Sequence, residues 1–88
     1  MDIVTKAFSN ITRMRLISCL GEKPKNVSEL IHTCGLSQSA VSQHLNKLKE
    51  SGIVECKKSG REQIYSIKHK EAVDISNKLI KFINKLKK

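Results

Sequence analysis

Two helical patterns separated by a short turn constrain this chain more than any other feature of its sequence. A short helix is predicted over residues 26–33, opened by Asn26 or Val27, and a second from about Ser37 to Glu50. Between them, Gly35 stands where a helix needs a left-handed residue after its last turn, and Ser37 can cap the next helix. Two helices joined by so short a turn are typical of a helix-turn-helix.

The stretch before this unit is predicted to form two helices. Apolar residues recur at helical spacing between Ile3 and Leu20, and Asn10 or Thr12 can cap a new helix within that stretch. We therefore expect a short first helix and a second from about Thr12 to Leu20. The single proline, Pro24, ends the helical pattern before the next unit begins.

The stretch after the unit is predicted to form a β-hairpin and a long helix. Residues 53–58 and 63–67 contain β-branched and aromatic side chains, and the turn between them includes Gly60, which can adopt a positive φ. Residues 68–88 place apolar side chains on one helical stripe. A length of 88 residues suits one domain over residues 1–88, mainly α (α+β), in the order α-α-α-α-β-β-α.

The net charge of the chain limits the kinds of partner that it is expected to bind. Lys and Arg number 17 against 8 Asp and Glu, a net charge of +9, which favours nucleic acid or an anionic membrane surface. No apolar run approaches the roughly 18 residues that span a bilayer. The N-terminus also lacks the basic-then-apolar pattern of a signal peptide. We expect a cytoplasmic protein with reduced thiols and no membrane partner.

The predicted helix from Ser37 to Glu50 separates an apolar face from a short, uncharged polar face. At about 100° per residue, one arc holds the residues expected to face the core, Ala40, Val41, Leu45 and Leu48. The opposite arc holds Ser39, Ser42, Gln43 and Asn46, with Gln38 and Lys49 at its edge. Gln can offer adenine a donor and an acceptor together, and Ser is small enough to approach either kind of base. The pattern favours a helix that reads DNA bases, and an ordinary solvated face is the alternative.

The predicted hairpin places three cations beside this helix. Lys57, Lys58 and Arg61 lie at or next to its turn. A basic loop in that position can lie along phosphates or enter the minor groove, which adds affinity with little sequence information. A solvated turn is the alternative for these residues.

Five blocks of the sequence share their order and residues with a known family. The blocks are Ala7–Leu16, Val27–Leu30, Gly35–Leu45, Leu48–Val54 and Gly60–Ile67. Together they resemble the ArsR/SmtB family of bacterial and archaeal transcriptional repressors. Because they cover nearly the whole chain, their combination is far more specific than any single block.

The resemblance implies a winged helix-turn-helix of about five helices, in which the two-stranded hairpin is the wing. It also implies a homodimer that binds double-stranded DNA at an imperfect palindrome in a promoter, usually to repress transcription. The family's DNA-contact segment matches Ser37, Gln38, Ser39, Ser42, Gln43 and His44, and a wing residue matches Arg61. The dimer interface is implied to lie in the first and last helices, about residues 2–9 and 69–87. The apolar residues expected there are Ile3, Val4, Ala7, Ile75, Leu79, Phe82, Ile83 and Leu86.

Metal binding is not expected. His44 falls on the core-facing side of its helix, where a bond to a neighbouring backbone group or a phosphate contact is favoured over metal ligation, since no second ligand lies at i+4. Two metal sites common in the family lack their ligands. Asn26 and Ser28 occupy the positions of one, and the last helix has His69 and Asp74 but no later histidine or carboxylate for the other. We expect no metal and no other cofactor.

The three cysteines leave one sensing hypothesis open. Cys19 shares a stripe with Leu16 and Leu20, so it is expected to be a core thiol. Cys34 and Cys56 flank the predicted DNA-reading helix, and exposed thiols there can respond to oxidants, persulfides or thiophilic metals. Inert packing is the alternative for both, and the sequence does not identify an effector.

Two other functions fit part of the sequence. One is a winged-helix module that dimerises or docks a partner without binding DNA, against which the Gln and Ser face argues. The other is membrane association through the lysine-rich last helix, against which the need to bury its apolar stripe argues. An enzyme is not expected, because the sequence shows no paired catalytic carboxylates, activated nucleophile or phosphate-binding glycine loop. The main prediction is a sequence-specific, dimeric DNA-binding transcriptional regulator.

Overall fold

The computed structural model describes residues 2–35 and 37–87, with every side chain in these ranges except that of Cys34. The prediction of a mainly α winged helix-turn-helix with a two-stranded wing is confirmed, with one short strand added. The elements are α1 (Ile3–Ala7), α2 (Ile11–Glu22), β1 (Lys25–Asn26), α3 (Val27–Cys34), α4 (Gln38–Ser51), β2 (Val54–Ser59), β3 (Glu62–Ile67) and α5 (Lys70–Leu86).

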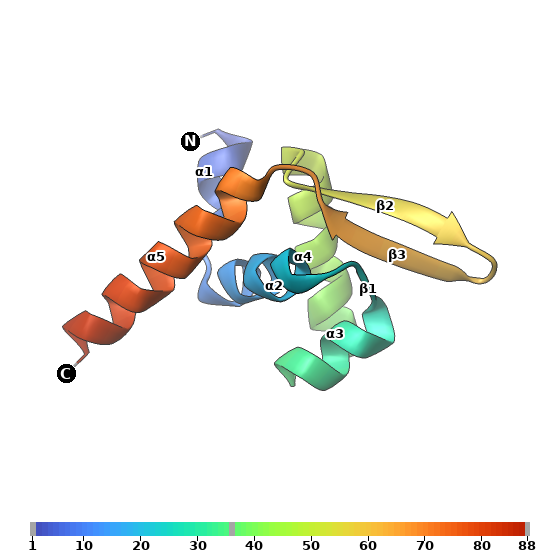
Figure 1. Cartoon of the computed structure of the whole chain (residues 1–88), viewed down its shortest axis with the longest axis horizontal. Helices are drawn as coiled ribbons and strands as arrows, with labels where there is room; N and C mark the ends of the chain where they lie inside the picture. The colour runs from blue at the N-terminus through green and yellow to red at the C-terminus, as the bar shows by residue number, and fades with distance from the viewer. Residues whose placement is uncertain (1, 36, 88) are drawn as a thin grey trace.

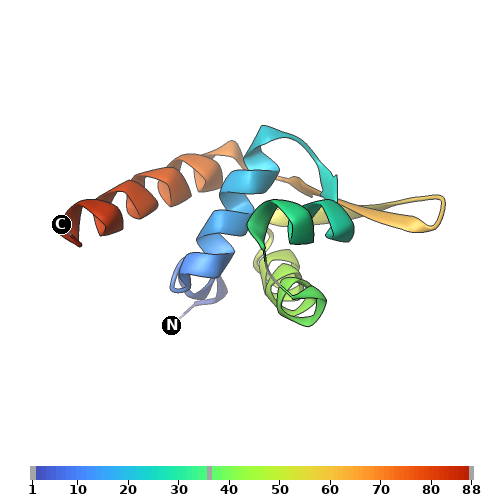
Figure 2. The ribbon, with the colours of Figure 1, turned by 90° about the horizontal axis from the view of Figure 1, so that it is seen from below.

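The second helix of the helix-turn-helix, α4, lies near the centre of the molecule, with the wing on one side and α5 on the other (Figure 1). The wing, formed by β2 and β3, projects away from the helices, and α5 extends in the opposite direction (Figure 2). The molecule measures 44 × 27 × 22 Å along its principal axes. Its long axis is therefore set by these two projecting elements.

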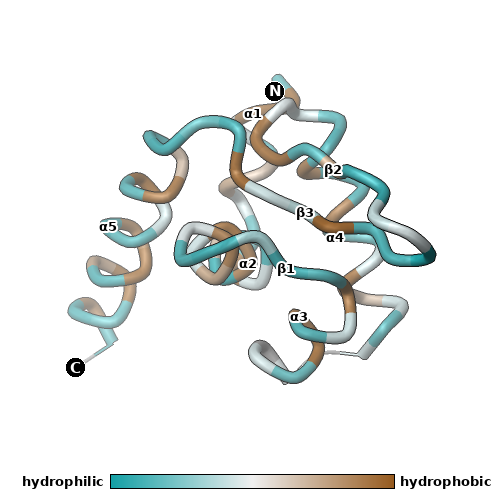
Figure 3. The backbone as a smooth tube through the Cα atoms, turned by 45° about the vertical axis from the view of Figure 1, so that its right-hand side comes forward, coloured by the Kyte–Doolittle hydropathy of each residue, from teal (hydrophilic) through white to brown (hydrophobic). Residues whose placement is uncertain are grey.

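The core is built from the apolar faces of α2, α3 and α4 and from the base of the wing. Its buried residues are Ala7, Leu16, Ile17, Leu20, Leu30, Val41, Leu45, Leu48, Ile53, Val54, Tyr65 and Ala72. Figure 3 shows hydrophobic segments alternating with hydrophilic ones along α5, as expected of a helix that buries only part of its surface.

Capping residues predicted from the sequence fix the ends of the helices that form the core. Asn10 caps α2, Asn26 caps α3 through a capping box, and Ser37 caps α4. Gly35 and Gly52 follow α3 and α4 with φ angles of 66° and 83°, the left-handed conformation expected after a helix. These local signals therefore position both helices of the helix-turn-helix.

The added strand, β1, was missed by the sequence analysis. It pairs antiparallel with β3, with Lys25 opposite Tyr65 and Asn26 opposite Ile64. A two-residue strand that contains a lysine and follows a proline has no alternating apolar pattern to reveal it. Its conformation is set by pairing with β3, a segment almost 40 residues further along the chain.

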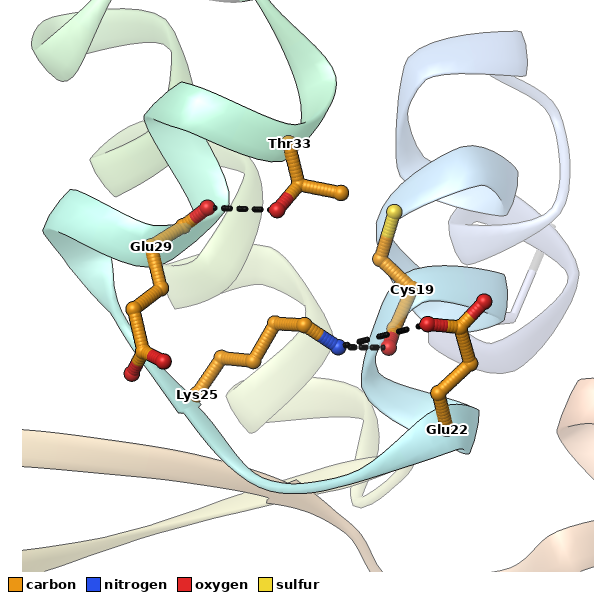
Figure 4. Close-up of polar contacts among 5 residues, drawn as sticks. All are labelled: Cys19, Glu22, Lys25, Glu29 and Thr33. Carbon is orange, nitrogen blue, oxygen red and sulfur yellow. Dashed lines mark hydrogen bonds and ion pairs between the residues drawn. The ribbon is translucent and has the colours of Figure 1, made fainter.

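Lys25 joins this strand to the end of α2 (Figure 4). Its side chain is almost completely buried, and Nζ donates a hydrogen bond to the backbone carbonyl of Cys19 at 2.5 Å. The same Nζ lies 3.9 Å from the exposed carboxylate of Glu22. A cation at this position satisfies a carbonyl in the last turn of the helix and interacts favourably with the helix dipole.

The second helix, α2, continues beyond its predicted end at Leu20 and packs closely against α5. At Gly21, an added Cβ would lie only 2.6 Å from Cγ1 of Val73 in α5. The Ser18 hydroxyl also donates a hydrogen bond to Oδ1 of Asn77 at 2.5 Å. The two helices are thus held together by a close backbone approach and by a polar contact, which fixes the direction of α5.

Candidate nucleic-acid interface

The predicted polar residues of α4 lie on its solvent side. The apolar residues Val41, Leu45 and Leu48 are completely buried, and Ala40 is half-buried at the edge of the same face. The exposed polar side chains are Ser37, Gln38, Ser39, Ser42, Gln43 and Asn46. This short, uncharged surface matches the pattern of hydrogen-bond donors and acceptors that a helix meets in the major groove.

The first residue of this surface, Ser37, also has a structural role. Its Oγ accepts a hydrogen bond from the backbone N–H of Ala40 at 3.2 Å and lies 3.4 Å from Oγ of Ser39. The cap satisfies one of the backbone donors that a helix leaves unpaired at its start. Ser37 thereby orients the first turn of α4, on which the exposed side chains begin.

The wing carries the predicted cations at its outer end. β2 and β3 pair in antiparallel register along their whole length, and Gly60 turns the chain between them with a φ of 64°. The side chains of Lys57, Lys58 and Arg61 are all exposed. Because the wing projects beyond the helices in Figure 1, these charges are held well away from the core.

The half-buried His44 contacts a side chain, whereas its sequence favoured a bond to a neighbouring backbone group or a phosphate contact. The phosphate contact stays a prediction. Nη1 of Arg13 lies 3.4 Å from Nδ1 of His44. Since a guanidinium only donates, this contact requires a neutral histidine with its proton on Nε2. Burial is the first cause that lowers the pKa of His44 below its ordinary value of 6.5, and the charges of Arg13 and Lys47 add to it. The lowered pKa favours the neutral form of His44, which is the form that the contact with Arg13 requires.

The cysteines are described only in part. Cys56 is half-buried in β2 and lies opposite Tyr65. The pKa of the Tyr65 phenol is raised, mainly because the phenol is buried and also because the Cys56 thiol lies beside it. Cys19 is half-buried and packs against the core, as its position in the sequence suggested. The side chain of Cys34 lies outside the described residues, so a redox role for Cys34 and Cys56 stays a prediction. Among the described residues, no three His, Cys, Asp or Glu side chains form a cluster that could hold a metal ion.

The residues predicted to form a dimer interface lie on α1 and α5. Leu79 and Ile83 are half-buried, while Ala7 is 2% exposed and so lies within its own chain. Val4 and Ile75 line one hollow of about 330 Å³ between the two helices. The remaining predicted residues are large apolar side chains that are at least 44% exposed, Ile3, Val4, Ile75, Phe82 and Leu86.

A comparison with known families explains this combination of helix, wing and apolar face. Residues 10–55, from the N-cap of α2 to the second residue of β2, match the family model of bacterial regulatory proteins of the arsR family. The chain belongs to the arsR family. This assignment confirms the resemblance found in the sequence.

Relatives and solved structures agree with the arsR assignment. The protein is 36% identical to the HTH-type transcriptional regulator YgaV of Escherichia coli over 70 aligned residues. This alignment covers 78% of this chain and 70% of YgaV. It is 34% identical over 74 residues to a biofilm growth-associated repressor of Xylella fastidiosa, covering 84% of this chain and 65% of that protein. The crystal structure of the repressor BigR from Xylella fastidiosa superposes with a TM-score of 0.81 at 31% identity, over 91% of this chain and 82% of BigR.

This arsR-family protein is a DNA-binding transcriptional regulator with a winged helix-turn-helix. Its family and relatives are regulators of transcription rather than enzymes. Within the described residues, no helix combines the length and the apolar character that crossing a bilayer requires.

Three cations near α4 were not singled out from the sequence of this arsR-family protein. Lys6, Arg13 and Lys47 come from α1, α2 and α4 and line one hollow. The position of Lys47 on the helical wheel was the only available signal, because it lies beside the polar face. The other two are brought to α4 by tertiary packing, which the pattern of the sequence does not encode.

Proposed function

We propose that this protein is a homodimeric repressor that binds an imperfect palindromic operator. The observation that carries the proposal is the exposed, uncharged polar face of α4 beside a basic wing. One relative is itself named as a repressor, which supports this direction of regulation. Repression by such a protein follows when the bound dimer occupies a promoter.

The proposal divides the DNA contacts into two classes. Ser39, Ser42 and Gln43 read base edges in the major groove, where Gln can bond adenine with a donor and an acceptor together. The exposed wing cations Lys57, Lys58 and Arg61 contact phosphates, which position the protein without reading sequence. Affinity is then largely electrostatic, while specificity resides on α4.

The proposed dimer pairs two copies through α1 and α5. This pairing buries the exposed apolar side chains of both helices, which a monomer leaves in water. Two α4 helices related by twofold symmetry then read half-sites about one helical turn, roughly 34–36 Å, apart. An imperfect palindrome is the operator symmetry that such a dimer matches.

Selection from random duplex DNA, followed by fluorescence anisotropy on the selected fragment, tests the proposal. If a dimer neutralises about eight phosphates, the logarithm of affinity falls with the logarithm of salt concentration at a slope of about −7. Gln43→Ala is expected to cost about 1–3 kcal/mol at one base step while leaving this slope unchanged. Asn84→Ala, which removes an exposed amide on α5, is the matched control and leaves both quantities unchanged.

A winged-helix module that docks a protein without binding DNA predicts a different result. Such a module selects no fragment and shows no affinity for random duplex DNA at low salt. Either finding overturns the proposed function. Selected fragments without inverted half-sites, bound by a monomer, overturn the dimeric part of it.

A further inference from the structure

A second group of cations lies on the side of α4 opposite the wing. Lys6 of α1, Arg13 of α2 and Lys47 of α4 line a hollow of about 460 Å³ between α1 and α4. Its single acidic residue is Glu50, and the remaining lining consists of Ile3, Ala7 and Ser9. We call Lys6, Arg13 and Lys47 the second basic flank.

Arg13 is held in place by neighbours from two helices. Its Nη2 donates a hydrogen bond to the backbone carbonyl of Lys6 at 2.9 Å, and its Nη1 lies 3.4 Å from Nδ1 of His44. The Ser9 hydroxyl donates to the same Lys6 carbonyl at 2.7 Å. The start of α2 is therefore tied to the end of α1 and to the middle of α4, so the guanidinium does not have to be ordered when a ligand arrives.

The flank retains hydrogen-bonding capacity for an anion. A guanidinium has five N–H donors, and the contacts with Lys6 and His44 account for two of them. Its Nε is buried and has no hydrogen-bond partner among the described residues, so the capacity for an external anion lies in the remaining N–H groups of Nη1 and Nη2. Lys6 and Lys47 are exposed, and the only ion pair in the described part of the chain joins Lys25 to Glu22.

The positive charges of the second basic flank affect the neighbouring side chain of His44. Besides burial, which is the larger cause, the charges of Arg13 and Lys47 lower the pKa of His44. Both cations therefore act on the same point beside α4. An anion at this position offsets the positive potential of Arg13 and Lys47, whereas a further cation adds to it.

The position of the flank matches the second rim of a DNA groove. Figures 1 and 2 show α1 on one side of α4 and the wing on the other. A helix in the major groove, which is about 12 Å wide, has phosphates on both of its rims. Cations on both sides of α4 therefore face two different phosphate strands.

We propose that Lys6, Arg13 and Lys47 bind backbone phosphates on the rim of the major groove opposite the wing. This inference rests on the proposed insertion of α4 into that groove. The two basic surfaces then hold α4 from both sides, and they fix its register without reading any base. Glu50 opposes the same phosphates and sets a limit on affinity.

Charge-neutralising substitutions of the exposed residues test this inference. Lys47→Gln and Lys6→Gln are compared with Lys81→Gln, which removes the same charge from an exposed position on α5, and with Lys58→Gln in the wing. The probe is the fragment selected with the unsubstituted protein, and a random duplex is measured beside it. Circular dichroism confirms that each variant is folded.

The second basic flank predicts that Lys47→Gln and Lys6→Gln weaken both duplexes by the same factor. Each dimer loses two cations, so the salt slope becomes shallower by about 2. Glu50→Gln is expected to change affinity in the opposite direction and to strengthen binding to both duplexes. Lys81→Gln leaves the slope unchanged.

The outcomes separate this inference from the function on which it rests. If Lys47→Gln and Lys6→Gln behave like Lys81→Gln while Lys58→Gln still flattens the slope, the flank does not touch DNA and the proposed function stands. A loss confined to the selected fragment assigns base reading to these lysines and overturns the phosphate role. If the unsubstituted protein binds neither duplex, the proposed function and the inference fail together.

Discussion

Lys25 is a buried charged residue that connects three elements of the fold. It is 4% exposed, pairs in β1 with the wing strand β3, and bonds the Cys19 carbonyl in α2. Removing a partner from a buried hydrogen bond costs about 1–3 kcal/mol because the remaining group stays desolvated. We therefore expect Lys25→Ala to lower the free energy of unfolding by about 1–3 kcal/mol in urea denaturation.

The neighbouring Lys23 provides the control for this prediction. Its side chain is exposed, so Lys23→Ala is expected to change stability by less than about 0.5 kcal/mol. The ion pair of Lys25 with exposed Glu22 contributes little by comparison, because such contacts are screened by water. Equal effects of the two alanine substitutions would show that the buried bond is not a source of stability.

The contact between Arg13 and His44 shows why single-residue roles are hard to read from a sequence. The helical wheel correctly placed His44 near the core, and the partner expected there was a backbone group or a phosphate. The observed partner lies 31 positions earlier in the chain. Nothing in the local pattern around His44 distinguishes an arginine from a backbone carbonyl, because the choice depends on how α2 crosses α4.

At the scale of elements, the contact between α2 and α5 fixes the direction of the last helix. In an unconstrained helix, Gly→Ala gains up to about 1 kcal/mol through helix propensity. At Gly21, the new Cβ would lie 2.6 Å from Val73 Cγ1, so α2 and α5 must separate or repack. We expect Gly21→Ala to destabilise the protein by about 1–3 kcal/mol despite its higher propensity.

A double-mutant cycle measures whether this cost arises from the close approach. Val73→Ala removes both atoms that the new Cβ would meet most closely, at its own cost in lost packing. If the close approach is the cause, the double variant is more stable than the sum of the two single effects predicts. If the two single effects on the free energy of unfolding add up to that of the double variant, the close approach is not the cause of the cost.

At the scale of the whole molecule, the exposed apolar surface and the basic surface lie on different elements. Phe82 on α5 is 56% exposed and belongs to the proposed dimer interface. Phe82→Glu is expected to give a folded monomer, because it places a charge in that interface without touching the core. Affinity for a palindromic fragment is expected to fall with it, since one protomer contributes only half of the contacts.

Sedimentation velocity and anisotropy check the two parts of this prediction. The control is Lys81→Glu, which also introduces a negative charge at an exposed position on α5. This variant is expected to leave the oligomeric state unchanged. A Phe82→Glu protein that remains dimeric would place the interface elsewhere on the chain. A monomer that retains full affinity for the palindrome would separate DNA binding from dimerisation.

The sequence alone determined the helices of the helix-turn-helix, their caps and the wing with its cations. Each of these depends on residues a few positions apart: Asn26 with Glu29, Ser37 with Ala40, and the glycine that turns a strand or ends a helix. Such interactions form wherever the local pattern occurs. The exposed face of α4 followed from the same periodicity.

Tertiary structure alone decided β1, the burial of Lys25, the partner of His44 and the second basic flank. Lys25 meets β3 across almost 40 residues, and Lys6, Arg13 and Lys47 meet only after α1 and α2 have packed against α4. These contacts depend on the distances and angles between elements. Packing of the shared core sets those angles, and no single stretch of sequence contains them.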